Sequence, residues 1–397
     1  MYKYCTLIYV IDREVESELF LLSKEFPIIA ILGPRQSGKT TLSQKVFSGY
    51  EYVSLEDIDH REFAQNDPRG FLLRYGGKVI FDEIQRVPQL ISYLQTHVDK
   101  HKENGQIVIT GSHNFLLMEQ ISQSLSGRVG IVKLLPFTAS ELKATNNSLG
   151  DLLYNGMYPR IYDQHIRPET FYKNYIATYI EKDVRQIKQI MNLDNFMKFI
   201  RVLAGRTGQE LHLASIGEEC GISHNTVNEW ISVLEASFII YRIRPYYKNY
   251  NKRIVKNSKI YFTDTGLVCN VLGIRKKEEL DYHFLKGSIF ETFVVNELMK
   301  ENLNTGEKVG LYFWRDNHKK ELDIVIDAGS QTYGVEIKSS ATIQEKYFAG
   351  LKYWSELSGV EPSKMYLVYG GEESFRRNNM NVVGWRHIKE KLMENAI

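Results

Sequence analysis

The chain has 397 residues and a formal net charge of +2, with 43% hydrophobic and 25% charged residues, which is ordinary for a globular protein of two or three domains. The near balance of charge excludes overall basicity as a means of holding nucleic acid, so such a surface would need local clusters. Three scattered cysteines without CxxC spacing argue against a zinc or disulfide framework, and the lack of any apolar stretch of roughly 18 residues predicts a cytoplasmic protein with no membrane segment.

Short apolar runs alternate with helix-like segments between Phe26 and about Leu142. The three apolar runs cover residues 27–32, 78–81 and 106–110. Each run ends in polar or glycine-containing sequence, as buried parallel strands do at their carboxyl ends. The helix-like segments lie at residues 40–47 and 89–102. This alternation predicts an α/β fold in which helices cover both faces of a parallel sheet, with ligands beyond the carboxyl ends of the strands.

The first apolar run leads into GPRQSGKT, a complete GxxxxGK[ST] loop, and a helix-like segment follows it. In such a loop the backbone N–H groups fold around phosphates, Lys39 reaches the β- and γ-phosphates, and the Thr40 hydroxyl coordinates Mg²⁺. No NKxD guanine-recognition motif follows the third run, so we expect ATP and ADP as ligands. The predicted nucleotide-binding residues are Gly33, Pro34, Arg35, Gln36, Ser37, Gly38, Lys39, Thr40 and Thr41.

Two acids, Asp82 and Glu83, end the second apolar run. Beside an intact phosphate loop, Asp82 is expected to join Thr40 in holding Mg²⁺, and Glu83 is expected to polarise the attacking water. The alternative is an exposed strand end with two solvated acids. Lys39 and Glu83 are therefore the first two predicted catalytic residues of an ATPase.

Two further residues are predicted to act on the γ-phosphate. The third run leads to Ser112, the favoured sensor, with Asn114 as the weaker choice and a plain turn as the alternative. Arg128, in the sequence LSGR, is a candidate arginine finger that would act in trans. It would then complete the site of a neighbouring subunit, so the active form would be a homo-oligomer. The alternative is a solvated arginine.

A polar, helix-breaking segment at residues 144–150 marks the end of the first domain. We predict domains at residues 1–145, 146–280 and 281–397. Residues 213–227 carry a helix-turn-helix pattern, and a strand expected at residues 238–243 would begin a wing. The middle domain is therefore expected to consist of a helical linker and a winged helix.

A basic run without a single acid extends from residue 242 to residue 259. It contains Arg242, Arg244, Lys248, Lys252, Arg253, Lys256 and Lys259, with Tyr246, Tyr247 and Tyr250 between them. This pattern favours a DNA contact, with the second helix of the motif in a major groove and the basic run on the phosphates. The alternative is a packing module or ATPase lid with a solvated basic face.

In the C-terminal domain, Asp323 lies on one alternating strand, and Glu336 and Lys338 lie on the next. Residues two apart on a strand share a face, so Glu336 and Lys338 point together, and a hairpin could bring Asp323 beside them. This resembles the PD-(D/E)xK nuclease arrangement, in which two carboxylates hold Mg²⁺ and the lysine steadies the attacking water or the developing charge. Glu291, on a preceding helix, matches the additional helical acid of that fold. The alternatives are surface ion pairs, or a nuclease-like fold that binds without cutting.

The motifs together resemble those of a prokaryotic family of uncharacterised ATPases, in which an AAA-type domain precedes a C-terminal region of unknown function, DUF4143. The matching stretches include GPRQSGKT, VIFDEIQ, ITGSHNFLL, LSGRVGIVKLLPFTASEL, GMYPR, YIEKDVRQI, ELDIVI and VEIKSS. The resemblance covers nearly the whole chain and implies an AAA-like core with an ATP-dependent mechanism. It strengthens Arg128 as the finger and suggests Arg160 as a second sensor arginine. Gly156-Met157 departs from the doubled glycine expected there.

These features predict Mg²⁺-dependent ATP binding and hydrolysis by an AAA-like protein that acts on DNA through a winged helix and a nuclease-like domain. The alternative function is an ATP-controlled regulatory switch that recruits a protein partner and cuts no DNA. A small-molecule phosphotransferase ranks last, because Glu83 suits water activation and no substrate lid is evident in the sequence.

Overall fold

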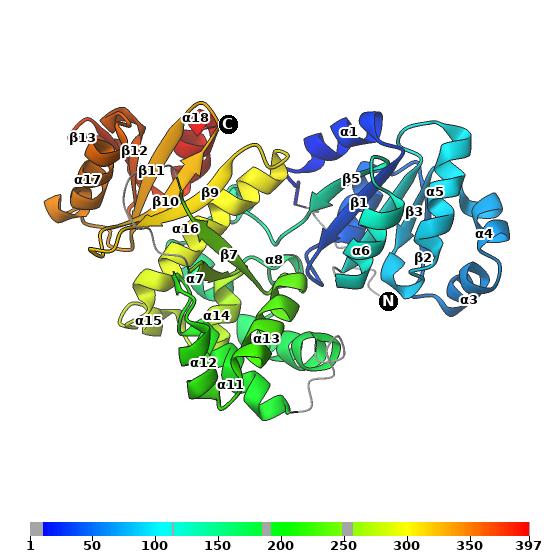
Figure 1. The fold of residues 1–397 in the computed structure, drawn as a ribbon, viewed down its shortest axis with the longest axis horizontal. Helices are drawn as coiled ribbons and strands as arrows, with labels where there is room; N and C mark the ends of the chain where they lie inside the picture. The colour runs from blue at the N-terminus through cyan, green and yellow to red at the C-terminus, as the bar shows by residue number, and fades with distance from the viewer. Residues whose placement is uncertain (1–10, 113–114, 185–191, 248–256, 397) are drawn as a thin grey trace, which may run out of the picture. The chain divides into compact units, whose positions relative to one another are not determined.

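The computed structural model describes residues 11–112, 115–184, 192–247 and 257–396 (Figure 1). The chain forms two compact units whose segments are interleaved. The first unit contains the described residues up to Phe137, together with Glu141–Asn146 and Met157–Phe171. The second unit contains Thr138–Ser140, Asn147–Gly156 and the residues from Tyr172 onward. Within the described residues, no helix has the length and apolarity needed to cross a membrane.

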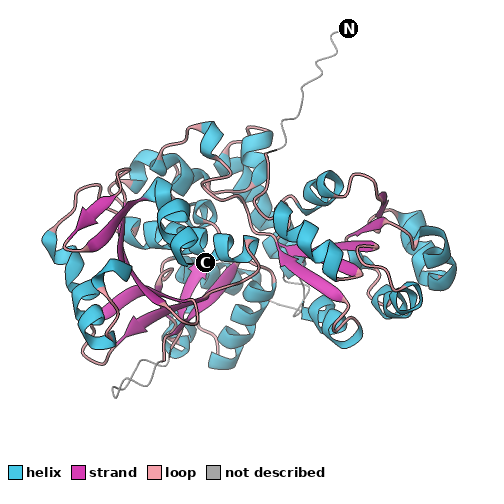
Figure 2. Ribbon diagram, turned by 90° about the horizontal axis from the view of Figure 1, so that it is seen from above, coloured by secondary structure: helices cyan, strands magenta, loops and turns pink. Residues whose placement is uncertain are grey.

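The first unit is built on a five-stranded parallel sheet with the order β2-β3-β4-β1-β5. Figure 2 shows the strands of the protein in magenta and the helices beside them in cyan. The strands of this sheet are β1 (Ile28–Gly33), β2 (Glu51–Ser54), β3 (Val79–Asp82), β4 (Ile107–Ser112) and β5 (Val129–Lys133). The three strands predicted from apolar runs are therefore β1, β3 and β4. The predicted parallel α/β sheet is confirmed, and the phosphate loop follows the carboxyl end of β1, which lies between β4 and β5.

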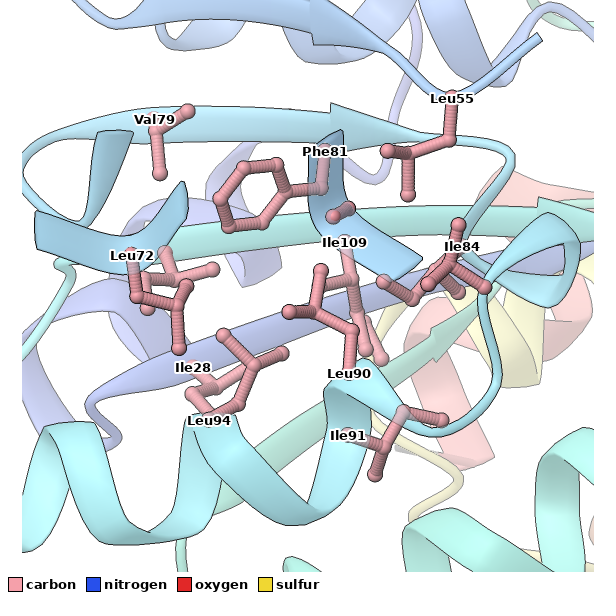
Figure 3. Close-up of a cluster of buried hydrophobic side chains, with 14 of the residues drawn as sticks. Ile28, Leu55, Leu72, Val79, Phe81, Ile84, Leu90, Ile91, Leu94 and Ile109 are labelled. Atoms are coloured by element: carbon pink, nitrogen blue, oxygen red, sulfur yellow. The ribbon is translucent and has the colours of Figure 1, made fainter. Parts of the chain in front are cut away.

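Helices cover both faces of this sheet. The helices of the first unit are α1 (Glu16–Glu25), α2 (Lys39–Val46), α3 (Ile58–Asn66), α4 (Pro68–Tyr75), α5 (Leu90–His101), α6 (Phe115–Ser124) and α8 (Pro159–Asp163). On one face, Leu90 and Leu94 of α5 point at strand residues that include Ile28 and Phe81 (Figure 3). On the other face, residues of α1 and α2 pack against Ile29 and neighbouring strand residues. Burial on both faces explains why β1 is apolar without alternation.

The second unit contains a nine-stranded sheet with the order β13-β14-β12-β11-β10-β9-β7-β8-β6. Its strands are β6 (Gln209–Glu210), β7 (Ile240–Pro245), β8 (Lys259–Phe262), β9 (Gly310–Arg315), β10 (Glu321–Asp327), β11 (Thr332–Lys338), β12 (Met365–Tyr369), β13 (Phe375–Arg377) and β14 (Met380–Gly384). β7 pairs with β8 in antiparallel fashion and with β9 in parallel fashion. Strands on either side of residue 280 thus belong to one continuous sheet.

The helices of the second unit are α7 (Leu149–Asn155), α11 (Leu193–Ala204), α12 (Leu213–Cys220), α13 (His224–Ala236), α14 (Thr265–Val271), α15 (Lys277–Leu280), α16 (Lys286–Asn304), α17 (Ala349–Ser358) and α18 (Glu394–Ala396). α9 (Pro168–Tyr175) crosses from the first unit into the second and continues as a π-helical segment, Ile176–Val184. α12 ends at Gly221, whose φ of 69° is left-handed, and Ser223 caps α13 by accepting a hydrogen bond from the Thr226 N–H. This helix pair agrees with the predicted helix-turn-helix boundaries.

The C-terminal segment of this unit has the element order α16, β9, β10, β11, α17, β12. β10 pairs with β9 and with β11 in antiparallel fashion, whereas β11 and β12 are parallel and are joined through α17. Trp314, Leu322 and Trp354 lie in the core cluster of this segment. Because β10 and β11 are neighbours in this sheet, the predicted hairpin does bring the two acid-bearing strands together.

Candidate functional site

The phosphate loop joins β1 to α2 and has the backbone that a phosphate cradle needs. Gly38 precedes α2 with a left-handed φ of 92°, and Gln36 has a φ of 63°. A Cβ at Gly33 would fall 2.1 Å from the carbonyl oxygen of Leu134, so a side chain there has no space. Lys39 is buried, and its Nζ donates to the carbonyl oxygens of Gly33 at 3.2 Å and Pro34 at 2.8 Å. The ammonium is thus held within the loop that would receive phosphates.

The electrostatic environment of Lys39 is unusual for a lysine. Burial lowers its pKa to about 8, against the opposing attraction of Glu83 and Asp82, and Arg35 adds to the lowering. A group with so low a pKa exchanges its proton near neutral pH. An anionic ligand placed beside it would favour the charged form.

Binding of ATP near pH 8 will therefore be accompanied by proton uptake at Lys39. The phosphates raise the pKa of the ammonium from about 8 back toward its ordinary value, so the bound state holds more proton than the free state. Calorimetry in two buffers of different ionisation enthalpy measures this uptake. At about pH 6, where Lys39 is already protonated before binding, the uptake should vanish. Buffer-independent heats at pH 8 would contradict the assignment of Lys39.

Asp82 and Thr40 lie together at the carboxyl ends of β3 and β1. The Thr40 hydroxyl is 3.0 Å and 3.1 Å from the two carboxylate oxygens of Asp82. Tyr52 donates to Asp82 Oδ2 at 2.8 Å, and the Thr110 hydroxyl also donates to this carboxylate. A hydroxyl and a carboxylate are ligands that suit Mg²⁺, which in phosphate-binding sites takes its other ligands from substrate and water. The residues present therefore fit the predicted cation.

Glu83 begins the segment after β3 with a left-handed φ of 59°. For a residue with a Cβ this backbone is strained, and such strain is concentrated at functional sites. The backbone N–H of Glu83 donates to Thr110, and its carboxylate accepts from the Ser112 hydroxyl at 3.3 Å and from the Gln85 amide. The structure thus brings the predicted water-polarising acid and the predicted sensor Ser112 into contact. Asn114 lies outside the described residues.

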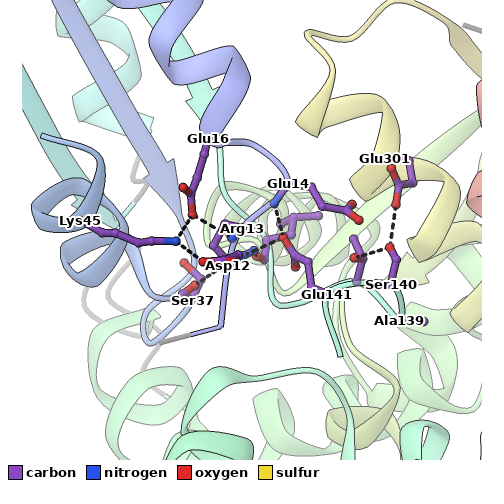
Figure 4. Close-up of polar contacts among 12 residues, drawn as sticks. Asp12, Arg13, Glu14, Glu16, Ser37, Lys45, Ala139, Ser140, Glu141 and Glu301 are labelled. Carbon is purple, nitrogen blue, oxygen red and sulfur yellow. Dashed lines mark hydrogen bonds and ion pairs between the residues drawn. The ribbon is translucent and has the colours of Figure 1, made fainter. Parts of the chain in front are cut away.

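Arg13 is part of the loop's support, and the sequence analysis missed it. Its guanidinium donates to the carbonyl of Ser37 at 3.0 Å, to the carbonyl of Leu135 at 2.7 Å and to the carboxylate of Glu141 at 3.0 Å (Figure 4). It also lies 4.9 Å from the ring centroid of Phe137. The planar guanidinium thus links the phosphate loop to Leu135 and Glu141, which lie more than 100 residues from Arg13 in the sequence. No motif around Arg13 announces this role.

The two arginines proposed for catalysis lie at other places. Arg128 forms a bidentate ion pair with Asp99 at 2.6 Å and 2.9 Å, just before the amino end of β5. Because β5 is parallel to β1, this end of the sheet is opposite to the phosphate loop. Arg128 therefore lies away from the phosphate loop of its own chain. Arg160, in α8, is exposed and donates to Gln164 at 3.0 Å.

The four residues of the predicted nuclease-like site gather on α16, β10 and β11. Lys338 Nζ lies 2.6 Å from Glu336 Oε1 and 3.7 Å from Asp323 Oδ2. Asp323 Oδ2 also accepts a hydrogen bond from the Ile337 N–H at 2.7 Å. Burial, reinforced by the Asp323 charge, raises the pKa of Glu336 to about 8 although Lys338 opposes the shift. Glu291 reaches this group through a further lysine.

That lysine is Lys259 of β8, which the sequence analysis assigned to a basic DNA-binding surface. The assignment is wrong for this residue, because its side chain is 3% exposed and pairs with Glu321, Glu291 and Asp323. Burial alone would lower its pKa, but the neighbouring acids, with Glu291 first, raise it well above its ordinary value. Tyr261 also donates to Glu291, at 2.8 Å. Neither Glu321 nor Tyr261 had been singled out from the sequence.

The rest of the basic run is divided by the structure. Tyr246 is buried in the second unit's core rather than available for bases, which corrects its predicted place on a DNA surface. Arg242 makes two 2.7 Å hydrogen bonds to Glu235, while Arg244 and Tyr247 are exposed. The remaining members of the run, Lys248, Tyr250, Lys252, Arg253 and Lys256, lie outside the described residues.

The parallel sheet, the phosphate loop and the paired acids at the end of β3 define an AAA-type P-loop ATPase domain. Three family models match the chain in order: an AAA domain at residues 25–143, a domain of unknown function (DUF8612) at residues 146–278, and a domain of unknown function (DUF4143) at residues 286–388. The AAA match and the DUF4143 match agree with the resemblance that the motifs predicted, an AAA-type domain followed by a C-terminal DUF4143 region.

Its relatives are described as uncharacterized proteins. One, from Mycobacterium tuberculosis, is 28% identical over 369 residues, which cover 91% of this chain and 81% of the relative. Another, from Haemophilus influenzae, is 23% identical, with 79% of this chain and 93% of the relative covered. Among solved structures, the chain is similar to a Walker-type ATPase of Pyrococcus abyssi at 15% identity, with a TM-score of 0.46 and coverage of 67% and 96%. A RuvB Holliday junction branch migration motor of Thermotoga maritima gives 17% identity, a TM-score of 0.30 and coverage of 58% and 90%.

Proposed function

We propose that this protein binds ATP with Mg²⁺ and hydrolyses it at the carboxyl edge of the first sheet. The observation that carries the proposal is that Thr40, Asp82 and Glu83 meet beside the loop that holds Lys39. A bound Mg²⁺ would draw negative charge from the β- and γ-phosphates as they react. Thr40 and Asp82 would hold that ion, Lys39 would bind the phosphates, and Glu83 would orient and polarise the attacking water. Ser112 would keep Glu83 in place and contact the γ-phosphate.

We propose that ATP hydrolysis serves an action on DNA, which the protein binds through a winged helix formed by α12, α13 and the β7–β8 pair. Exposed residues of this winged helix support the proposal. The first turn of α13 exposes His224, Asn225 and Asn228, and amide side chains at such positions suit the edges of bases in a major groove. Arg244 and Tyr247 extend from the end of β7 as an exposed cation and ring. On this proposal the segments 1–145, 146–280 and 281–397 are the ATPase, the DNA-recognition segment and a nuclease-like segment.

Turnover of ATP will be stimulated by one form of DNA, and that form identifies the substrate. The measurement is steady-state ATP turnover with Mg²⁺, alone and with single-stranded, duplex or branched DNA, with Glu83→Gln as the blank. Asn225→Asp together with Asn228→Asp should remove the stimulation and keep the DNA-free rate, because added negative charge repels phosphates. Gln344→Glu adds one negative charge of the same kind to an exposed residue outside this helix and should keep the stimulation. Turnover that ignores every DNA form would reject the DNA proposal while leaving ATP hydrolysis intact.

A regulatory switch that recruits a protein partner is the second candidate function. The observation that favours it is the pairing of Lys259 with Glu291, Glu321 and Asp323, which neutralises the acids that a nuclease would use for a metal ion. The order of α16, β9, β10, β11, α17 and β12 supports a nuclease-like fold for this segment, and such a fold also serves for binding without cleavage. A switch would turn ATP over slowly and without regard to DNA.

We also propose that Arg128 is an arginine finger in a homo-oligomer. Its position at the sheet edge opposite the phosphate loop supports action in trans. Arg128→Ala should lower turnover by about 10³-fold or more and keep ATP binding. Mixing this variant with Lys39→Ala should restore part of the rate. The intact phosphate loop of an Arg128→Ala subunit can then receive Arg128 from a neighbouring Lys39→Ala subunit. Arg86→Ala, which removes an exposed arginine paired with Glu56, is the control. An unchanged rate in Arg128→Ala would reject the finger.

A further inference from the structure

We propose that Lys259 is the resident cation of an acidic cluster in the second unit, so that its ammonium holds the place that a divalent metal ion would need. The acidic cluster consists of Glu291 on α16, Glu321 and Asp323 on β10, and Glu336 on β11. The inference concerns the second unit alone and stands whether or not the first unit hydrolyses ATP.

The ammonium of Lys259 lies among three carboxylates of the cluster. Its Nζ is 2.5 Å from Glu321 Oε1, 3.0 Å from Glu291 Oε1 and 4.0 Å from Asp323 Oδ1. Nζ also lies 5.6 Å from the centroid of the Phe313 ring, and the side chain is almost completely buried. A buried ammonium is stable only where acceptors replace its lost hydration. Lys259 is therefore the counter-ion of this cluster and is withdrawn from solvent.

Further donors occupy oxygens on the other side of the cluster. Lys338 Nζ donates to Glu336 Oε1 at 2.6 Å, and the Ile337 N–H donates to Asp323 Oδ2 at 2.7 Å. Two lysines thus face four carboxylates within one group of contacts. Among the described residues, Glu336 Oε2 is buried and has no hydrogen-bond partner. This oxygen is an acceptor that a cation entering after loss of Lys259 could use.

A divalent metal ion does not fit the cluster as it stands. Mg²⁺ needs an octahedral shell of oxygens at about 2.0–2.1 Å, whereas the cluster oxygens surround an ammonium at hydrogen-bond distances. The ion would also have to share the cluster with a like charge. In the part of the chain that the structure describes, no three His, Cys, Asp or Glu side chains form a group that could hold a metal ion. The predicted Mg²⁺ ligands Asp323 and Glu336 form ion pairs with lysines instead.

Strand pairing explains how a residue so distant in sequence reaches the cluster. β8 pairs with β7, β7 pairs with β9, and β9 pairs with β10, so Lys259 lies in the same sheet as Asp323. Lys259 belongs to the middle segment, residues 146–280, whereas the acids belong to the C-terminal segment, residues 281–397. If the segment has the proposed nuclease-like fold, it is one in which an internal lysine has replaced the metal ion. Such a segment would lack the metal ion that holds the reacting phosphate and water in this kind of nuclease site.

The test is Mn²⁺ binding to the full-length chain, measured by calorimetry without nucleotide. Asp82→Asn is present in every sample, so that the phosphate-loop site contributes no metal ion. We expect this parent protein to show no Mn²⁺ binding that depends on Asp323. Replacing Lys259 by the uncharged, similarly long methionine should create such binding, with an affinity at least about ten-fold above any Mn²⁺ affinity of the parent, because Glu291, Glu321 and Asp323 then lack the ammonium of Lys259. Adding Asp323→Asn should abolish the new binding.

Two outcomes would overturn the inference. One is Mn²⁺ binding to the parent that is lost with Asp323→Asn, a comparison that does not require Lys259→Met to fold. The other is a folded Lys259→Met variant that gains no Mn²⁺ binding. Lys259→Arg keeps the positive charge and should behave as the parent does. ATP turnover of the same Lys259 variants, measured with Asp82 intact, reports separately on the proposed ATPase, so the two ideas fail independently.

Discussion

Glu83→Gln will bind ATP with Mg²⁺ and lose turnover by about 10²–10⁴-fold, the usual contribution of a positioned general base. The amide keeps the size of the side chain and can still accept from the Ser112 hydroxyl, which lies 3.3 Å from the Glu83 carboxylate. It cannot accept a proton from the attacking water. Steady-state turnover with Mg²⁺, together with ATP affinity from calorimetry, separates the loss of chemistry from any loss of binding.

Glu56→Gln is the matched control for this variant. Glu56 is an exposed acid of the first unit whose partner is Arg86, at 3.4 Å. Its replacement removes the same charge from the same unit without touching the phosphate loop, so turnover should be unchanged. If Glu83→Gln also retains its turnover, the water is polarised by another residue. A variant that fails to bind ATP would instead show that Glu83 supports the loop.

The nucleotide site could be predicted from the sequence because its residues follow strand ends within short motifs. Lys39 and Thr40 follow the short loop after β1, Asp82 ends β3 and Glu83 follows it, so the strand pattern places them at one edge of a parallel sheet. Arg13 could not be predicted in this way. Its partners at Leu135 and Glu141 are brought to it by the tertiary fold, and a single arginine in a helical neighbourhood carries no local signal.

The acidic cluster of the second unit could also be predicted only in part from the sequence. The two-residue period of a strand correctly placed Glu336 and Lys338 on one face, and the β10–β11 hairpin brought Asp323 to them. The predicted DNA contact was wrong for Lys259, because a run of basic residues without acids indicates a surface that is exposed to solvent. Its counter-charges come from β10 and α16, more than 30 residues further along the chain. Only the pairing of β7 with both β8 and β9 makes this arrangement apparent.

The same lysine leads to the second large effect. Lys259→Met will lower the free energy of unfolding of the second unit by about 3–5 kcal/mol at neutral pH, the usual cost of removing one partner from a buried charge pair. The carboxylates of Glu291, Glu321 and Asp323 would then face one another without the ammonium of Lys259. Urea unfolding followed by tryptophan fluorescence is the measurement. Trp314 and Trp354 are buried in this unit, and each of the four tryptophans belongs to it.

Acid should reduce this loss. Burial already raises the pKa of Glu291 against the opposing charge of Lys259, so loss of the ammonium raises this folded-state pKa further. The variant then binds protons on folding and gains stability relative to the wild type as pH falls. Below about pH 3 the acids are mostly protonated even in the unfolded chain, and the gap between the two proteins should be smallest. Lys352→Met, which breaks an exposed 2.9 Å pair with Glu345, should cost about 0–1 kcal/mol with little pH dependence. Equal stability losses for the two variants at neutral pH would mean that Lys259 is not a buried counter-ion. The proposal that its ammonium takes the place of a metal ion in the acidic cluster would then be rejected.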